Sequence, residues 1–327
     1  MLLHIRLRRE PSNLATGRAD EQLSFRFPAR RATVPASDSH IRQPTVKAAS
    51  ENSLFMTPDP VRTRREPIFN LPTIVFLSVA VLVVIHALRM LLSDGSDFAL
   101  VVDWAVIPAR WSVAYGGASM KEVLTALEGV APAEVLAPLQ DLAQYVLGEG
   151  EGRPWTAITY AFLHGSWTHV LINSVWLAAF GTPIARRCGG VRLLLLAAAS
   201  AIGGALLYAW INPLQILPMI GASAAVSGMM AAASWFMFAP SHWLPEGRVS
   251  QPHERQRESL GRIVRNRQVL IFLGVWFAAN YVFAFVQPFG ATDASIAWEA
   301  HIGGFLAGLV LFPALDPLPT RRERMSA

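Results

Sequence analysis

Six apolar stretches, each about as long as a lipid bilayer is thick, run along this chain. About 20 mostly apolar residues cross a hydrocarbon core of about 30 Å as a helix. The stretches are approximately residues 71–92, 156–180, 193–211, 220–238, 269–286 and 295–315. They are too long for barrel strands, and in lipid each must satisfy its own backbone hydrogen bonds. The pattern therefore predicts an all-α polytopic membrane protein, a bundle of six transmembrane helices.

Composition agrees with this prediction. The 327 residues are 53% hydrophobic and 16% charged, which is too apolar for an ordinary soluble domain of this length. The formal net charge is +5, but the basic residues gather in the N-terminal region and in particular loops. Orientation in a membrane explains this distribution better than nucleic acid, so we expect no nucleic-acid partner. The single cysteine, Cys188, cannot form an intramolecular disulfide.

The positions of Lys and Arg predict how the chain is oriented. Basic residues precede the first stretch, join the second to the third and the fourth to the fifth, and follow the sixth, whereas residues 212–219 and 287–294 contain none. Cytoplasmic loops carry the excess of Lys and Arg. We therefore expect a multi-pass protein with both termini in the cytoplasm, in a bacterial inner (plasma) membrane.

Three regions lie outside the predicted spans. Residues 1–66 are polar without helical or strand period, and we expect a disordered basic cytoplasmic region, unless translation begins at Met56. Residues 318–327 are expected to form a cytoplasmic tail after a membrane domain of residues 67–317. The outer loop 93–154 carries nine acidic and three basic residues. Its stretch 121–147 suits short amphipathic helices at the membrane interface, and a soluble cap is the alternative.

Two reactive side chains lie inside apolar stretches. Ser223 is predicted just inside the outer end of the fourth span, and His301 one or two turns below the outer end of the sixth. A polar residue at membrane depth costs free energy and is a functional candidate. A serine becomes a nucleophile when a neighbouring imidazole accepts its proton, so the pair could act as a catalytic dyad. Spans two to six offer no acidic third member, and Glu299 should point to another side of its helix.

Further residues could support this pair. His169 and Asn173 lie four residues apart on one helical face of the second span and could donate to an oxyanion, together with the backbone N–H of Ser223. His164 is expected to brace the outer loop, and Asn280 to make packing contacts. Gly221 leaves room for a substrate backbone. Gly304 and Gly308 continue a four-residue repeat of small residues that allows close helix approach and could hold His301 against Ser223.

Together these motifs resemble those of the rhomboid family, over about residues 67–317. The resemblance is carried by Gly221-Ala222-Ser223, by Ala300-His301-Ile302-Gly303-Gly304 with Gly308, and by His164 to His169 with Asn173. It implies a six-helix core and an intramembrane serine endopeptidase that cleaves transmembrane segments of other membrane proteins. Ser223 and His301 would be catalytic, His169 and Asn173 would line the oxyanion site, and no metal or cofactor would be needed.

The chain also departs from the family pattern. Ala224 stands where many members have Gly, Thr156 follows Trp155 where Arg is common, and Ser227 stands where some members stack an aromatic ring on the base. Two other interpretations stay open. A catalytically silent rhomboid-like protein could bind membrane helices as a chaperone or adaptor, and a small-solute transporter could use six helices. The sequence does not define the natural substrate or the oligomeric state.

Overall fold

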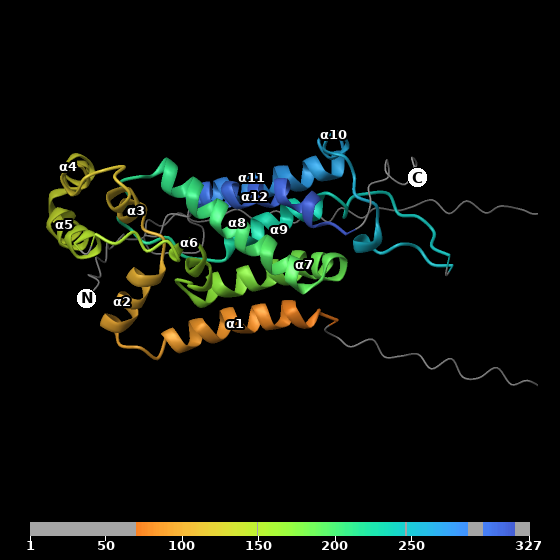
Figure 1. Ribbon diagram of the computed structural model, residues 1–327, viewed down its shortest axis with the longest axis horizontal. Helices are drawn as coiled ribbons and strands as arrows, with labels where there is room; N and C mark the ends of the chain where they lie inside the picture. Colours follow the sequence, from red (N-terminus) through yellow and green to blue (C-terminus); the bar gives the residue numbers. More distant parts are fainter. Residues whose placement is uncertain (1–69, 149, 246, 287–296, 318–327) are drawn as a thin grey trace, which may run out of the picture. The chain divides into compact units, whose positions relative to one another are not determined.

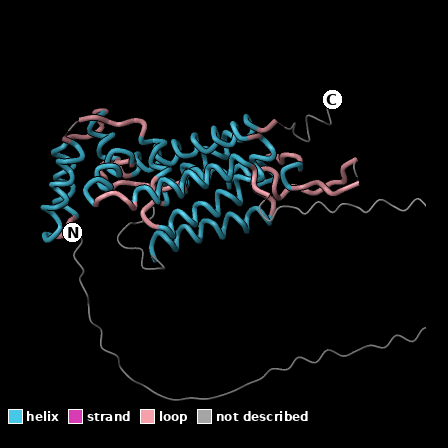
Figure 2. The backbone as a smooth tube through the Cα atoms, turned by 90° about the horizontal axis from the view of Figure 1, so that it is seen from below, coloured by secondary structure: helices cyan, strands magenta, loops and turns pink. Residues whose placement is uncertain are grey.

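The computed structural model describes residues 70–148, 150–245, 247–286 and 297–317, all within one compact unit of residues 65–327. These residues are mostly helical (Figure 2), and among them there are two isolated β-bridges but no strand. The prediction of an all-α fold is thus confirmed for the described part of the chain. The predicted N-terminal region, residues 1–66, and the predicted tail, residues 318–327, lie outside the described residues.

Each of the six apolar stretches overlaps one helix of at least 12 residues. These are α1 (Thr73–Arg89), α7 (Trp167–Cys188), α8 (Gly190–Ile211), α9 (Ser223–Ser234), α11 (Arg267–Val286) and α12 (Trp298–Leu315). In Figure 1, α1 lies beside α7, and α11 beside α12. Of the described helices, α8 and α12 are long and apolar enough to cross a membrane, and α1 and α11 are shorter apolar helices. The count of six spans is therefore not established by length and composition.

Two predicted stretches differ from the helices observed. Residues 156–180 were expected as one helix, but α6 (Thr156–Thr159) and the 3₁₀ helix η1 (Tyr160–Phe162) end before His164, and α7 begins at Trp167. The break arises because Ser166 is extended and caps α7, its hydroxyl accepting the His169 N–H at 3.1 Å. In the fourth stretch, α9 is only 12 residues long, because an irregular segment containing Gly221 precedes it.

Helices α8, α9 and α12 pack backbone to backbone. A methyl group added at Gly304 would collide with the Ala224 carbonyl, and one at Gly308 with the backbone of Gly228. A methyl group at Gly228 would in turn collide with the Ser200 side chain of α8. The small residues on α12 thus permit close approach to α9, as the sequence predicts.

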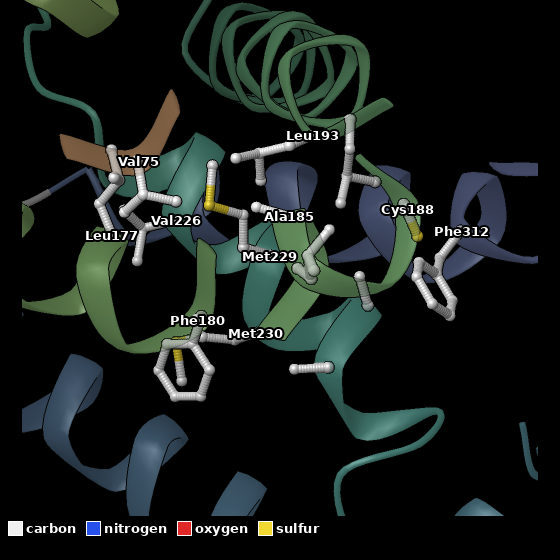
Figure 3. Close-up of a cluster of buried hydrophobic side chains, with 14 of the residues drawn as sticks. Val75, Leu177, Phe180, Ala185, Cys188, Leu193, Val226, Met229, Met230 and Phe312 are labelled. Carbon is white, nitrogen blue, oxygen red and sulfur yellow. The ribbon is translucent and has the colours of Figure 1, made fainter. Parts of the chain in front are cut away.

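An apolar core surrounds the contact of α9 with α8 and α12 (Figure 3). Val75 of α1, Leu177 of α7, Met229 of α9 and Phe312 of α12 belong to one buried cluster. Phe312 also stacks on Phe236, with ring centroids 5.5 Å apart. This packing holds α9 between α7 and α12 and so fixes the position of the N-terminus of α9.

The segment 93–154, predicted to be an outer loop, folds into four helices with a small core: α2 (Asp94–Trp104), α3 (Pro108–Ala114), α4 (Met120–Val130) and α5 (Ala133–Leu147). They gather at one end of the long helices (Figure 1). Helices α4 and α5 match the predicted amphipathic stretch, but Val123 and Val146 are buried in this core. Arg110 lies within it and donates to the Val146 and Val102 carbonyls at 3.2 and 2.6 Å. The placement of these helices at the membrane interface or in a soluble cap stays a prediction.

The opposite end of the long helices is closed by a buried ion pair. Arg187, in the last turn of α7, forms two hydrogen bonds of 2.8 Å with the Asp316 carboxylate. It also donates to the His253 and Arg255 carbonyls at 3.0 and 2.6 Å, and both paired side chains are 0% exposed. Arg187 is one of the basic residues predicted to join the second stretch to the third. It lies in α7 rather than in a loop, and it links α7 to the end of α12 and to the connection between α9 and α11.

Candidate active site

Ser223 and His301 meet across the contact between α9 and α12. The Ser223 hydroxyl oxygen lies 2.7 Å from Nε2 of His301, a hydrogen-bond distance. Ser223 is the first residue of α9, and His301 lies in the first turn of α12. Both side chains are half-buried. A hydroxyl hydrogen-bonded to an imidazole nitrogen is the minimum arrangement for a serine nucleophile and its base.

The segment before Ser223 places the hydroxyl at a helix N-terminus. Gly221 has φ of +126°, a conformation that side chains rarely adopt, and its N–H donates to the Tyr160 carbonyl at 3.0 Å. A methyl group at Gly221 would also lie 2.8 Å from the His169 ring. The first N–H groups of a helix are unpaired along its backbone and, with the helix dipole, favour negative charge. The sequence therefore needs glycine at position 221 for both conformation and space.

The start of α3 and the residues before it also hold the segment that precedes Ser223. Val106 and Met219 form an isolated antiparallel bridge, with N–H to carbonyl distances of 3.2 and 2.8 Å. The Ala109 N–H donates to the Gln215 carbonyl at 3.0 Å. The chain leading into Ser223 is thus held by hydrogen bonds to Val106, Ala109 and Tyr160.

His169 and Asn173 occupy the first two turns of α7, as the spacing predicts. The His169 ring borders Gly221, two residues before Ser223. Asn173 is 3% exposed, and its Nδ2 has no hydrogen-bond partner among the described residues. A buried amide donor without a partner costs free energy unless something binds it, so Asn173 could donate to a transient anion.

His164 contacts the site through His169. Its side chain is fully buried, and its ring lies edge-on to the His169 ring with centroids 5.0 Å apart. Its carbonyl accepts a hydrogen bond of 2.8 Å from Arg89 at the end of α1. His164 therefore links α1 to the start of α7, whereas it was expected to brace the loop of residues 93–154.

Asn280 of α11 contacts His301, whereas the sequence analysis predicted packing contacts for it. Its Oδ1 is hydrogen-bonded to Nδ1 of His301, and its Nδ2 donates to the Trp276 carbonyl at 2.9 Å. A single Asn in an apolar stretch does not show which residue it contacts. The one available signal was that Asn280 lies in the half of the predicted fifth span that is expected at the same depth as His301. Glu299 accepts a hydrogen bond of 3.3 Å from Asn212.

Ser227 lies one turn after Ser223. Its hydroxyl donates to the Ser223 carbonyl at 2.7 Å. Within the described residues, no group of three or more His, Cys, Asp and Glu side chains is placed to hold a metal ion.

Comparison with known proteins gives a family match over the same region. A family model described as Rhomboid domain matches residues 151–315, about half of the chain. Similar relatives are named rhomboid protease GlpG. The one from Serratia proteamaculans is 26% identical over 172 residues, which cover 53% of this chain and 50% of the relative. The one from Pectobacterium atrosepticum is 25% identical over 157 residues, which cover 48% of this chain and 47% of the relative. The chain spans about half the length of these curated relatives.

Proposed function

The chain belongs to the rhomboid family and is an integral membrane protein, and on this premise we propose that it is an intramembrane serine endopeptidase that cleaves transmembrane segments of other membrane proteins. The observation that carries the proposal is the 2.7 Å contact between the Ser223 hydroxyl and Nε2 of His301. The relatives' name, rhomboid protease, supports it.

The proposed reaction uses Ser223 as nucleophile and His301 as base. Nε2 of His301 accepts the hydroxyl proton while Oγ of Ser223 attacks the scissile carbonyl carbon, giving a tetrahedral oxyanion. Collapse of this intermediate breaks the C–N bond, and His301 returns the proton to the leaving amine. Water, activated by the same imidazole, then hydrolyses the acyl-serine ester and regenerates both residues.

The oxyanion would be stabilised where α7 meets the start of α9. We assign the Asn173 amide, the His169 ring and the backbone N–H of Ser223 as its donors. Two observations support this assignment: Nδ2 of Asn173 has no hydrogen-bond partner within the described ranges, and the His169 ring borders Gly221. Donors that are already in place cost no reorganisation when the charge develops.

For the membrane arrangement we propose six spans with both termini in the cytoplasm of a bacterial cell. Ser223 and His301 would then lie toward the outer leaflet. The absence of Lys and Arg in residues 212–219, which lead into Ser223, supports this orientation, as do Arg187 and the other basic residues toward the opposite end.

The first test is labelling and cleavage by purified full-length protein in detergent. A fluorophosphonate, which reacts with activated serines, should label wild type and leave Ser223→Ala unlabelled. A generic transmembrane substrate should be cleaved by wild type only. Ser234→Ala is a matched control, since Ser234 lies on the same helix and bonds to the Ala231 carbonyl.

Each result has a distinct meaning. Labelling and cleavage that both depend on Ser223 would support the proposal. Labelling without cleavage would support an activated serine with a narrower choice of substrate. Folded wild-type protein that shows neither would refute the proposal and favour the silent helix-binding alternative.

A further inference from the structure

The base of the proposed dyad has a second hydrogen-bond partner on a third helix. His301 of α12 bonds through Nε2 to Ser223 of α9 and through Nδ1 to Oδ1 of Asn280 on α11. We propose that Asn280 is a positioning residue that holds the His301 imidazole in its reactive tautomer and orientation. This inference rests on the proposed function.

The orientation of the Asn280 amide follows from its other contact. An amide nitrogen only donates, and the carbonyl of Trp276, one turn earlier on α11, only accepts. The 2.9 Å bond between them directs Nδ2 of Asn280 toward Trp276 and leaves Oδ1 facing His301. The amide is thus fixed within its own helix, independently of His301.

This orientation determines which imidazole nitrogen carries the proton. Oδ1 of Asn280 can only accept, so Nδ1 of His301 must be the N–H donor. In the neutral ring Nε2 then has the free lone pair, and Nε2 is the nitrogen that faces the Ser223 hydroxyl. The opposite tautomer would break the bond to Asn280 and remove the acceptor from Ser223.

Asn280 would also assist the proton transfer. When Nε2 takes the proton from Ser223, the ring becomes a cation, and a hydrogen bond from a charged donor is about twice as strong as a neutral one. The amide oxygen supplies this stabilisation without placing a full charge in apolar surroundings.

Other residues near His301 are engaged elsewhere. Glu299 accepts from Asn212, and the Ser227 hydroxyl donates to the Ser223 carbonyl. Among the described residues, the hydrogen bonds recorded for the His301 ring go to Ser223 and Asn280. Asn280 thus occupies the position that a triad gives to its third member.

Asn280 can be changed without disturbing a packed core. It lines a groove of about 520 Å³ between α11 and the start of α12, together with Trp276, Trp298 and Ile302. Its side chain is half-buried. Helix α11 is held separately by Trp276, which stacks on Phe305 of α12 with centroids 5.3 Å apart.

The test compares Asn280→Leu, which keeps the size but removes the acceptor, with Asn280→Asp, which keeps an acceptor oxygen. For Asn280→Leu we expect kcat and the rate of fluorophosphonate labelling of Ser223 to fall about 10- to 100-fold, the range of one hydrogen bond to a charged group, with KM nearly unchanged. Asn280→Asp should recover most of this loss.

Asn266→Leu is the matched control. Asn266 directly precedes α11, and its side chain bonds to the Phe238 carbonyl and the Gln268 N–H at 3.2 and 2.9 Å. It undergoes the same chemical change and weakens the start of the same helix. We expect it to lower the unfolding temperature and leave kcat per folded molecule unchanged.

A second readout does not require activity. Nitrogen NMR of isotope-labelled histidine, with the His301 signal identified by its loss in His301→Ala, reports which ring nitrogen is protonated. Wild type should show the Nδ1–H form, and Asn280→Leu should show a mixture. This pattern in protein that neither labels nor cleaves would refute the proposed function and still support the positioning of His301.

Two outcomes would overturn the inference. One is an unchanged tautomer and unchanged kcat in Asn280→Leu. The other is equal loss of kcat in Asn280→Leu and Asn266→Leu, which would trace the effect to α11 as a whole.

Discussion

Two polar sites, one at each end of the helical bundle, differ in how their side chains are paired. At one end, the side chains of Arg187 and Asp316 are buried and bonded to each other, and Arg187 also donates to two backbone carbonyls. At the other end lie Ser223, His301 and Asn173. Ser223 and Asn173 have uncharged polar side chains, and Nδ2 of Asn173 has no hydrogen-bond partner among the described residues. A saturated ion pair leaves nothing for a ligand to bind, whereas an unpaired donor remains available to one.

This difference suggests that the Arg187–Asp316 pair serves the stability of the fold and that the Asn173 amide serves the proposed reaction. An unpaired buried polar group costs about 1–3 kcal/mol, so proteins retain one where it serves a purpose. Removing one partner of a buried ion pair leaves an uncompensated charge and is strongly destabilising. Substitutions at the two ends should therefore have different consequences, for catalysis at one end and for stability at the other.

The largest effect should come from removing either member of the proposed dyad. Ser223→Ala, His301→Ala and the double variant should each lower kcat by about 10⁶-fold, because the two side chains act as one unit. All three proteins should remain folded and unfold at the wild-type temperature within a few degrees. Cleavage of a transmembrane substrate, beside a thermal unfolding curve for each variant, measures this. Additive losses in the double variant would contradict a shared role.

Breaking the ion pair at the opposite end should affect stability. Arg187→Met should lower the free energy of unfolding by up to about 3 kcal/mol, because the buried Asp316 carboxylate would lose both hydrogen bonds from Arg187, while Arg257, 3.9 Å away, would still pair with it. Combining it with Asp316→Leu should restore part of the loss. Arg186→Met is the control, since Arg186 is exposed and should matter by less than about 1 kcal/mol. Reversible unfolding in mixed detergent measures each variant, and equal effects at positions 186 and 187 would refute the structural role of the pair.

Removing the unpaired donor should slow the reaction without weakening the fold. Asn173→Ala should lower kcat by up to about a hundredfold, less than the loss of Ser223, because His169 and the backbone N–H of Ser223 remain as donors. The free energy of unfolding should change by less than about 1 kcal/mol, because no hydrogen bond of Nδ2 is lost. Asn212→Ala, which removes a paired amide at the same end, should leave kcat unchanged. A fall in stability that matches the fall in kcat would mark Asn173 as structural.

Local sequence patterns predicted much of this architecture. The long apolar runs in the sequence located α8, α11 and α12 within a few residues, because a run of about 20 apolar residues predicts a membrane-length helix from local composition alone. The break before α7 was missed because it depends on Ser166 adopting an extended conformation and capping the helix, which competes with the apolar run around it.

The polar contacts between distant segments were the hardest to predict. Ser223 and His301 could be paired because each belongs to a recognisable motif at a similar expected depth. Asn280 has no such motif, and its contact with His301 depends on how α11 rotates against α12. The pairing of Arg187 with Asp316, 129 residues apart, likewise depends on where α12 ends rather than on either local sequence.

The smallest effect should come from an exposed ion pair near the end of the bundle that holds Arg187 and Asp316. Arg248 forms two hydrogen bonds with Glu254 in the connection between α9 and α11, and these bonds, with the Gln251 N–H, lower the pKa of Glu254 to about 2. Because folding lowers the pKa of Glu254, the pair stabilises the fold at pH values above 4.5, the pKa of this group in the unfolded chain. This stabilisation is lost as the pH falls from 4.5 toward about 2. Because the arginine is 49% exposed, Arg248→Ala should change the unfolding free energy by at most about 1 kcal/mol at pH 7. The difference between the variant and wild type should shrink as the pH falls through this window, which unfolding curves at pH 7 and pH 3 would measure. A difference that persists or grows at low pH would show that Arg248 acts through something other than the Glu254 carboxylate.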